Sequence, residues 1–163
     1  MTYRLCLLLL GLYTQTCSAQ SAPDTLYRRF TEAYARLDSH AVAALYTPDA
    51  VLLNLYDGSP PHSLSGTEEI LRYFGTFFRT IAANGQRMEL TFRITDRQAV
   101  DDHFLDNGYY RLAYLREGED PIVTFGKFST VVVPEAEGYR FQVDATTNAD
   151  ADAYREAHPI NDP

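Results

Sequence analysis

The chain has little cysteine, a shortage of positive charge and no long apolar segment, and each shortage excludes a class of protein. Its only cysteines are Cys6 and Cys17, both near the N-terminus, which argues against a small disulfide scaffold. The apolar run from Leu5 to Tyr13 is shorter than the roughly 20 residues that a membrane-spanning helix needs. With 14 basic and 22 acidic residues, the chain repels nucleic acid and anionic lipid head groups.

The first nineteen residues have the pattern of an export signal. Arg4 precedes the apolar run, and Cys17-Ser18-Ala19 offers the small residues that a signal peptidase reads. Cleavage after Ala19 predicts a secreted or periplasmic protein, not held to the membrane, of 163 less 19, or 144 residues. We expect one domain over residues 20–147 and an acidic tail over 148–163. A retained N-terminal anchor and a lipid-modified Cys17 are alternatives, although no apolar residue directly precedes that cysteine.

Apolar residues at helical spacing predict three N-terminal helices. The predicted ranges are 25–37, 41–46 and 66–83, with Pro48 ending the second helix and Asn84-Gly85 the third. A strand over 50–56 and an irregular, proline-rich loop over 57–65 separate the last two helices.

Beyond Gly85 the apolar period changes from helical to alternating, which indicates strands. The predicted strands are 87–94, 98–105, 109–116, 121–133 and 139–147. Asn107-Gly108 is the dipeptide best suited to a tight hairpin turn, so we expect the chain to reverse there. The tail from Asn148 has no apolar period and is expected to be frayed.

Several short motifs occur in the order found in one superfamily. They are LYTPDAVL at 45–52, GTEEI at 66–70, and GKFSTV at 126–131 leading to GYRF at 138–141. In this order the chain resembles the nuclear-transport-factor-2-like superfamily and its SnoaL-like branch, with Tyr139 where a tryptophan is usual. The resemblance implies an α+β cone, a roll of three N-terminal helices packed on a curved, mostly antiparallel sheet, with an apolar pocket inside. Members use that pocket for isomerisation, cyclisation, epoxide hydrolysis or binding alone, so the fold does not select a function.

The resemblance also tests one mechanism. Ketosteroid isomerases of this superfamily need a carboxylate base and a tyrosine that donates to the oxyanion. A gapless match of LYTPDAV places Phe30 at the tyrosine and Asn54 at the base. Phenylalanine donates no hydrogen bond and an amide takes no proton at neutral pH, so this alignment excludes the isomerase mechanism.

Other side chains are candidates to line the pocket, because tyrosines and small polar groups on inward strand faces suit a ring-bearing ligand. The candidates are Phe30, Tyr34, Asn54, Tyr56, Tyr110, Tyr114, Phe128 and Asp144. Asp144 is the one carboxylate in the last strand, and burial in the pocket would make it an acid or base. Strand alternation instead places it opposite the apolar residues Tyr139, Phe141 and Val143, so we expect a surface carboxylate paired with an arginine unless a bulge changes the register.

No metal or cofactor is expected. The acidic clusters at 101–106 and 148–152 lack the glycine and distal glutamate of a calcium loop, and the sequence has no nucleophile elbow or phosphate loop. We therefore expect a domain that binds a small, mostly apolar molecule. The alternatives are an isomerase, cyclase or hydrolase that acts on such a molecule, and a homodimeric interaction module whose cavity is filled by its own side chains.

Overall fold

The computed structural model describes residues 23–160 of the 163. The predicted export signal, with Cys6 and Cys17, lies outside the described residues. The helices are α1 (Asp24–Ala35), α2 (Ser39–Ala43), α3 (Gly66–Ala83) and α4 (Ala151–Glu156). The strands are β1 (Tyr46–Asn54), β2 (His62–Ser65), β3 (Arg87–Val100), β4 (His103–Leu115), β5 (Ile122–Glu135) and β6 (Gly138–Asn148).

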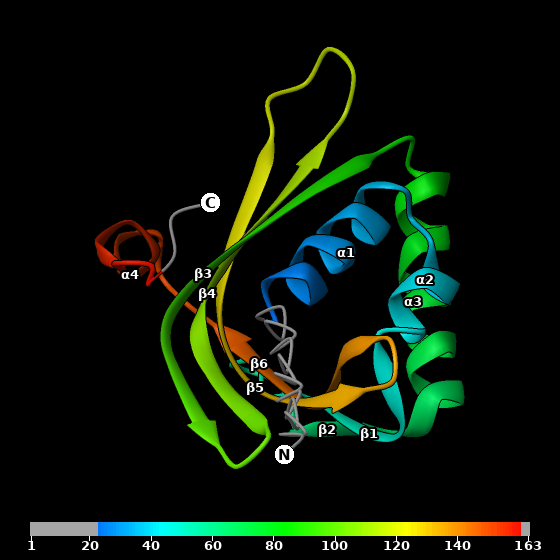
Figure 1. The fold of residues 1–163 in the computed structure, drawn as a ribbon. Coiled ribbons are helices and arrows are strands. Elements are labelled where there is room, and N and C mark those ends of the chain that lie inside the picture. Colours follow the sequence, from blue (N-terminus) through cyan, green and yellow to red (C-terminus); the bar gives the residue numbers. More distant parts are fainter. Residues whose placement is uncertain (1–22, 161–163) are drawn as a thin grey trace, which may run out of the picture.

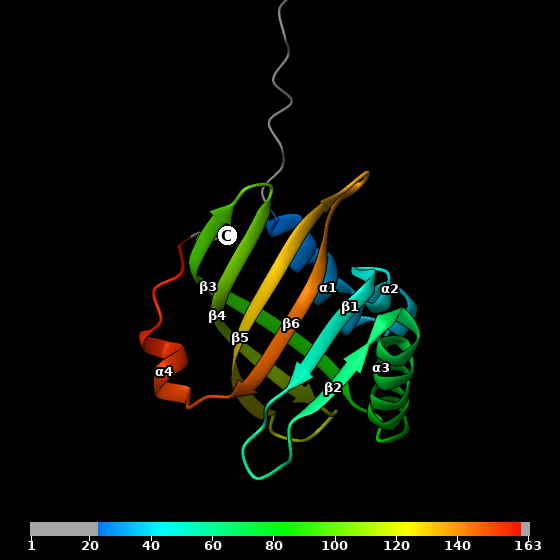
Figure 2. The ribbon, with the colours of Figure 1, turned by 90° about the horizontal axis from the view of Figure 1, so that it is seen from below.

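All six described strands form one curved sheet in the order β2-β1-β6-β5-β4-β3 (Figure 2). Neighbouring strands are antiparallel except β1 and β6, which run parallel. The sheet curls around α1, while α2 and α3 lie beside the opening of the curl (Figure 1). The predicted α+β cone with a curved, mostly antiparallel sheet is therefore confirmed.

Helices α1 and α3 contribute aromatic side chains that pack against one another and against the sheet. The ring of Phe30 in α1 packs against those of Phe74 in α3 and Phe92 in β3, with centroids 6.1 and 5.8 Å apart. Edge-to-face pairs of this kind add to the free energy gained by burying the rings. Among the described residues no helix is long and apolar enough to cross a membrane.

The hairpin prediction at Asn107-Gly108 is wrong. The chain turns instead at Asp101-Asp102, where Asp101 adopts a positive φ of 56°, which Asp tolerates better than most residues. Gly108 lies inside β4, opposite a bulge in β3. A Cβ at Gly108 would lie 2.1 Å from the carbonyl oxygen of Arg93 and 2.9 Å from the Phe128 ring, so this glycine permits close packing inside the sheet.

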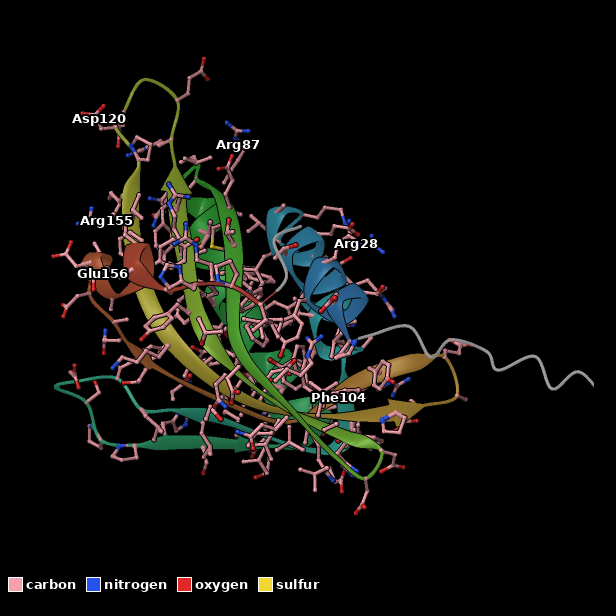
Figure 3. All side chains as sticks on the ribbon, turned by 60° about the vertical axis from the view of Figure 1, so that its left-hand side comes forward. Arg28, Arg87, Phe104, Asp120, Arg155 and Glu156 are labelled. Atoms are coloured by element: carbon pink, nitrogen blue, oxygen red, sulfur yellow. The ribbon has the colours of Figure 1, made fainter. Side chains whose placement is uncertain are left out.

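Two segments predicted to be irregular are ordered. Residues 62–65 form the edge strand β2, paired with β1. The tail expected to fray contains α4, which packs on the outer face of the sheet with Arg155 and Glu156 directed away from it (Figure 3). The Tyr154 ring contacts Phe125 at 5.2 Å, and the Arg93 guanidinium lies over it at 4.2 Å. A single buried tyrosine in a polar segment carries no helical period, so the sequence pattern missed this helix.

Candidate functional site

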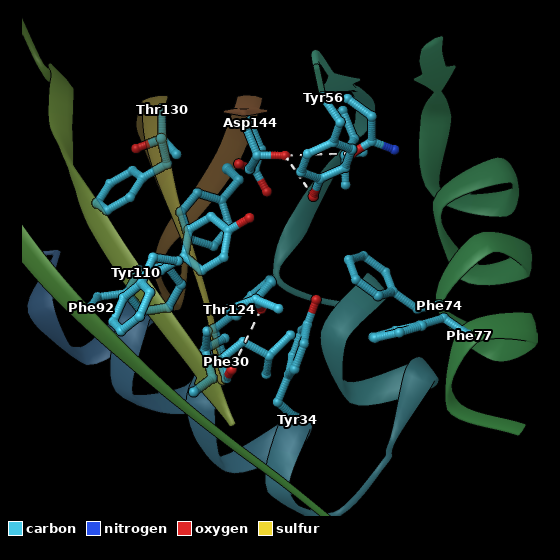
Figure 4. A pocket seen from close by; sticks show the side chains of 18 of the residues that line it. Phe30, Tyr34, Tyr56, Phe74, Phe77, Phe92, Tyr110, Thr124, Thr130 and Asp144 are labelled. Atoms are coloured by element: carbon cyan, nitrogen blue, oxygen red, sulfur yellow. Dashed lines mark hydrogen bonds between the residues drawn. The ribbon is translucent and has the colours of Figure 1, made fainter. Parts of the chain in front are cut away.

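A cavity of about 320 Å³ opens between the concave face of the sheet and helices α1 and α3 (Figure 4). The structure places all eight residues proposed from the sequence in its lining. They are Phe30, Tyr34, Asn54, Tyr56, Tyr110, Tyr114, Phe128 and Asp144. Of the 22 described lining residues, 13 are Phe or Tyr, so the wall is largely aromatic with hydroxyl groups set into it.

Asp144 faces this cavity, so its prediction as a surface carboxylate paired with an arginine is wrong. The register between β5 and β6 shifts: Val132 pairs with Phe141 and Val131 with Val143, which leaves Gln142 as an extra residue. This bulge turns Asp144 to the same face as Phe141. The Asp144 side chain accepts a 2.6 Å hydrogen bond at Oδ2 from the Tyr46 hydroxyl, which lies behind the cavity wall.

Burial raises the pKa of the Asp144 carboxyl from 3.8 to about 6, against the opposing effect of the Tyr46 hydrogen bond. The group therefore exchanges a proton close to neutral pH. Its Oδ1 oxygen has no hydrogen-bond partner among the described residues, and no side-chain oxygen or nitrogen fully buried in this part of the chain lacks one. Oδ1 is consequently accessible from the cavity.

Tyr34 presents a second polar group to the cavity, one helical turn beyond Phe30. Their rings stack at 5.0 Å, and the Tyr34 ring also contacts Phe74 (Figure 4). The Phe78 ring lies 5.1 Å from it as well. Burial raises the pKa of Tyr34 well above 10, so the hydroxyl keeps its proton. No described side chain accepts that proton in a hydrogen bond, which leaves Tyr34 as a donor for a bound molecule.

A group of tyrosine hydroxyls and small polar side chains lies between β1, β4, β6 and α3. The Thr146 hydroxyl lies 3.2 Å from the Tyr56 hydroxyl and 3.4 Å from Asn54 Oδ1, and its single proton can be donated to either of them. Burial raises the pKa of Tyr73 to about 12, an effect reduced by a hydrogen bond from Asn54. Burial likewise raises the pKa of Tyr110, which also hydrogen-bonds Tyr56. This end of the cavity therefore offers neutral donors and acceptors.

The opposite end of the cavity borders a polar network whose members each bond to another member, and the sequence pattern did not predict it. Tyr27 donates to Asp106 Oδ2 at 2.8 Å and contacts the Thr130 hydroxyl at 2.7 Å. Arg97 holds Asp106 with two further bonds of 2.7 and 2.9 Å and reaches Asp24 at 2.8 Å. Because the Tyr27 hydroxyl donates its proton to Asp106, it has no proton left to donate to a bound molecule. The position of Tyr27 three residues before Phe30, on the apolar face of the helix, was the available signal.

Gly126 determines where the Tyr110 ring lies. The two residues pair across β4 and β5, and a Cβ at Gly126 would lie 2.2 Å from the Tyr110 ring. We expect Gly126→Ala to displace this ring into the cavity and to lower the free energy of unfolding by about 1–3 kcal/mol, as overpacking does. Chemical denaturation measures the loss. In a Tyr110→Ala background the same substitution should cost far less, and an equal cost in both backgrounds would contradict this packing.

The described residues 23–160 contain no group of three or more His, Cys, Asp or Glu side chains that could hold a metal ion.

The fold and this cavity define a class of protein, a cone-shaped α+β domain with an internal aromatic pocket. Residues 27–147 match the model of the SnoaL-like domain, and the chain belongs to that family, within the nuclear-transport-factor-2-like superfamily. None of the curated proteins compared with this chain matches it.

Solved structures share the fold at low sequence identity. A ketosteroid isomerase-like protein from Erwinia carotovora atroseptica is 16% identical, with a TM-score of 0.61 over 82% of this chain and 98% of that one. ActVI-ORFA from Streptomyces coelicolor is 15% identical, with a TM-score of 0.64 over 76% and 92%. A Catenulispora acidiphila protein in complex with S-DNPA is 18% identical, with a TM-score of 0.64 over 77% and 89%.

Proposed function

We propose that the cavity binds a small, mostly apolar, ring-bearing molecule. The aromatic lining of a 320 Å³ space is the observation that carries this proposal. Pockets of this kind bind ligands by burying apolar surface and orient them with a few polar groups. The polar groups available here are Asp144, Tyr34 and the cluster of hydroxyl and amide side chains around Tyr56. The Catenulispora relative in complex with S-DNPA supports a binding role for the fold.

An open cavity disfavours the alternative of an interaction module filled by its own side chains. Such a module would need large side chains such as Phe74, Phe77 and Phe128 to fill the cavity, and these three line the space instead. Dimerisation through the outer sheet face remains a separate prediction, and α4 covers part of that face.

Proton transfer on the bound molecule is a second candidate function, favoured by the presence of both Asp144 and Tyr34 in the cavity lining. A carboxylate with a pKa near 6 can take a proton from carbon next to a carbonyl group. A tyrosine that keeps its proton can donate to the oxyanion that then develops. Phe30 and Asn54 cannot act as the tyrosine donor and the carboxylate base of an isomerase. Tyr34 and Asp144 supply these two groups from other positions of the same cavity.

We propose in addition that the protein is exported and acts in a secreted or periplasmic setting after its first nineteen residues are removed. Its charge of −8 before cleavage supports partners other than nucleic acid or anionic membranes. Mass spectrometry of the exported protein should find an N-terminus at Gln20, whereas an intact Met1 would contradict export by cleavage.

A cavity-filling substitution tests the binding proposal. Leu112 lines the cavity on β4 and is buried. Replacing it by tryptophan should fill the space and abolish the rise in melting temperature that ring-bearing ligands cause, because only a ligand that binds the folded state raises it. Thermal shift with a panel of bicyclic aromatic compounds provides the measurement.

Leu55→Trp is the matched control for this experiment. Leu55 directly follows β1, is 42% exposed and does not line the cavity, so a tryptophan there leaves the cavity open. The chain has no other tryptophan, and each variant therefore also reports its environment by fluorescence. Ligand shifts that survive Leu112→Trp, or that vanish equally in the control, would contradict binding in the cavity.

A further inference from the structure

Asp144 is the only carboxylate among the 22 described residues of the cavity lining, and none of these is Lys, Arg or His. The cavity therefore carries either one negative charge or none, depending on the proton at Asp144. A buried carboxylate without a cationic partner is costly, because burial removes its hydration and here only the Tyr46 hydroxyl replaces part of it.

The titratable groups that face Asp144 from the surrounding elements supply no compensating charge. They are Tyr27 and Tyr34 on α1, Tyr46 on β1, Tyr73 on α3 and Tyr110 on β4, all interacting with the Asp144 carboxylate as neutral phenols. The facing residue on β5 is the uncharged Thr130.

The nearest cation in the same row across the sheet is already neutralised. Cross-strand pairing runs from Arg97 to Asp106, then Thr130, then Asp144. Three strand spacings of about 4.8 Å separate Arg97 from Asp144. Arg97 forms ion pairs of 2.7 and 2.8 Å with Asp106 and Asp24. It is therefore not a counter-ion for Asp144.

The chain next to the cavity is acidic as well. Tyr56 and Tyr114 of the lining lead into the loops 57–61 and 116–121, which contain Asp57, Glu117, Glu119 and Asp120. Asp120 lies in the projecting loop between β4 and β5 (Figure 3). Against these four carboxylates the two loops hold one cation, Arg116, paired with Glu119 at 3.1 Å. Such a field attracts cations and repels anions.

We propose that the molecule bound in the cavity is a ring-bearing organic cation, a protonated amine whose ammonium group pairs with Asp144 while its ring lies among the aromatic side chains. This rests on the proposed binding function and names the charge of the ligand. The ammonium donates to Asp144 Oδ1, the oxygen that Tyr46 leaves unoccupied. Aromatic faces attract a cation through their quadrupoles, and Tyr34, Phe74 and Tyr110 supply such faces in the lining.

Three probes of one shape and different charge test this inference: 1-naphthylmethylamine, 1-naphthylmethanol and 1-naphthoate. Isothermal titration calorimetry at pH 7.5 should rank them amine, then alcohol, then carboxylate. A charge-assisted pair in a partly desolvated site predicts about a tenfold preference for the amine over the alcohol. Asp144→Asn should abolish that preference and leave the alcohol affinity within about threefold. Glu137→Gln removes one charge from an exposed turn and should leave the ranking unchanged.

The affinity for the amine should also depend on pH. Because Asp144 ionises with a pKa of about 6 in the free protein, the amine meets a mostly neutral site at pH 5 and an ionised one at pH 7.5. The amine should therefore bind about tenfold more weakly at pH 5 than at pH 7.5, while the amine itself stays protonated at both pH values. The alcohol affinity should change little, and the amine affinity of Asp144→Asn should be flat.

The outcomes separate this inference from the binding proposal. If the alcohol equals or exceeds the amine, or the carboxylate binds most tightly, the charge assignment is overturned while the cavity stays a binding site. An alcohol that binds at least as tightly as the amine would favour a neutral substrate for proton transfer. If no probe binds a protein that unfolds cooperatively, both the inference and the binding proposal fail.

Discussion

Replacing Arg97 by methionine should lower the free energy of unfolding by about 3–5 kcal/mol, the cost of breaking a buried ion pair by removing one partner. Arg97 makes a two-bond contact with Asp106, which is fully buried at 0% exposure. Without Arg97 the carboxylate keeps only the hydroxyl of Tyr27 and must be protonated or left uncompensated. Urea denaturation at pH 7 measures the loss.

Arg28→Met provides the comparison for Arg97. Arg28 pairs with Glu32 at 2.7 Å, but the two side chains are 62% and 45% exposed. Exposed pairs along a helix contribute about 0.3–0.5 kcal/mol, so this variant should differ little from the wild type. Similar losses in the two variants would show that Asp106 is less dependent on its arginine than the buried geometry requires.

Replacing Asp144 by asparagine should stabilise the protein at pH 8 by up to about 3 kcal/mol, the free energy that corresponds to a pKa raised from 3.8 to about 6. The native state binds the proton more tightly than the unfolded chain. The penalty for the ionised carboxylate is therefore fully present above pH 6 and disappears as the pH falls below about 4. As the pH falls from 6 to 4, the free energy of unfolding of the wild type should rise relative to that of the variant.

Denaturation curves of both proteins at pH 8, 6 and 4 measure this difference. Asparagine can still accept the Tyr46 hydrogen bond, so the comparison isolates the charge. A stabilisation that shrinks on acidification supports a buried, unpaired carboxylate. A destabilised variant at pH 8 would contradict it. A gain in stability accompanied by lost binding is the usual trade-off at a functional site.

The sequence predicted α1, α3 and the class of fold because its amphipathic period is strong there. It missed α4, and Pro48, expected to end the second helix, lies inside β1, since α2 ends at Ala43. In α3, Ile70, Phe74, Phe78 and Ile81 repeat at helical spacing and are all buried. Local pattern and tertiary packing agree there, and the first carboxylates of the helix suit its positive end. The same holds for α1, although Tyr27 was not recognised as part of the buried face.

The misplaced hairpin arose because one dipeptide satisfies two different requirements. Asn-Gly is the preferred pair for a tight turn, yet Gly108 is needed inside a strand, where the Arg93 carbonyl and the Phe128 ring leave no room for a side chain. That requirement comes from residues distant in the sequence. The true turn at Asp101-Asp102 has no glycine and gave a weaker local signal.

The misassigned face of Asp144 has a comparable cause. Strict alternation predicts its direction only if β6 pairs without interruption, and the bulge at Gln142 reverses every position that follows. The bulge depends on how β5 and β6 fit together around the cone, which the sequence of β6 alone does not encode. No register shift lies between Leu52 and Asn54 in β1 or between Tyr110 and Tyr114 in β4, so alternation kept each pair on one face, and all four residues line the cavity.

A carbon-13 NMR titration of the Asp144 side-chain carboxyl, assigned by comparison with Asp144→Asn, tests the central claim most directly. An ionisable carboxylate buried in the wall of an aromatic cavity predicts a midpoint near pH 6. A midpoint near 4, the ordinary value for an aspartate in water, would place the group in solvent and remove the basis for proton transfer by Asp144 and for the cationic ligand class.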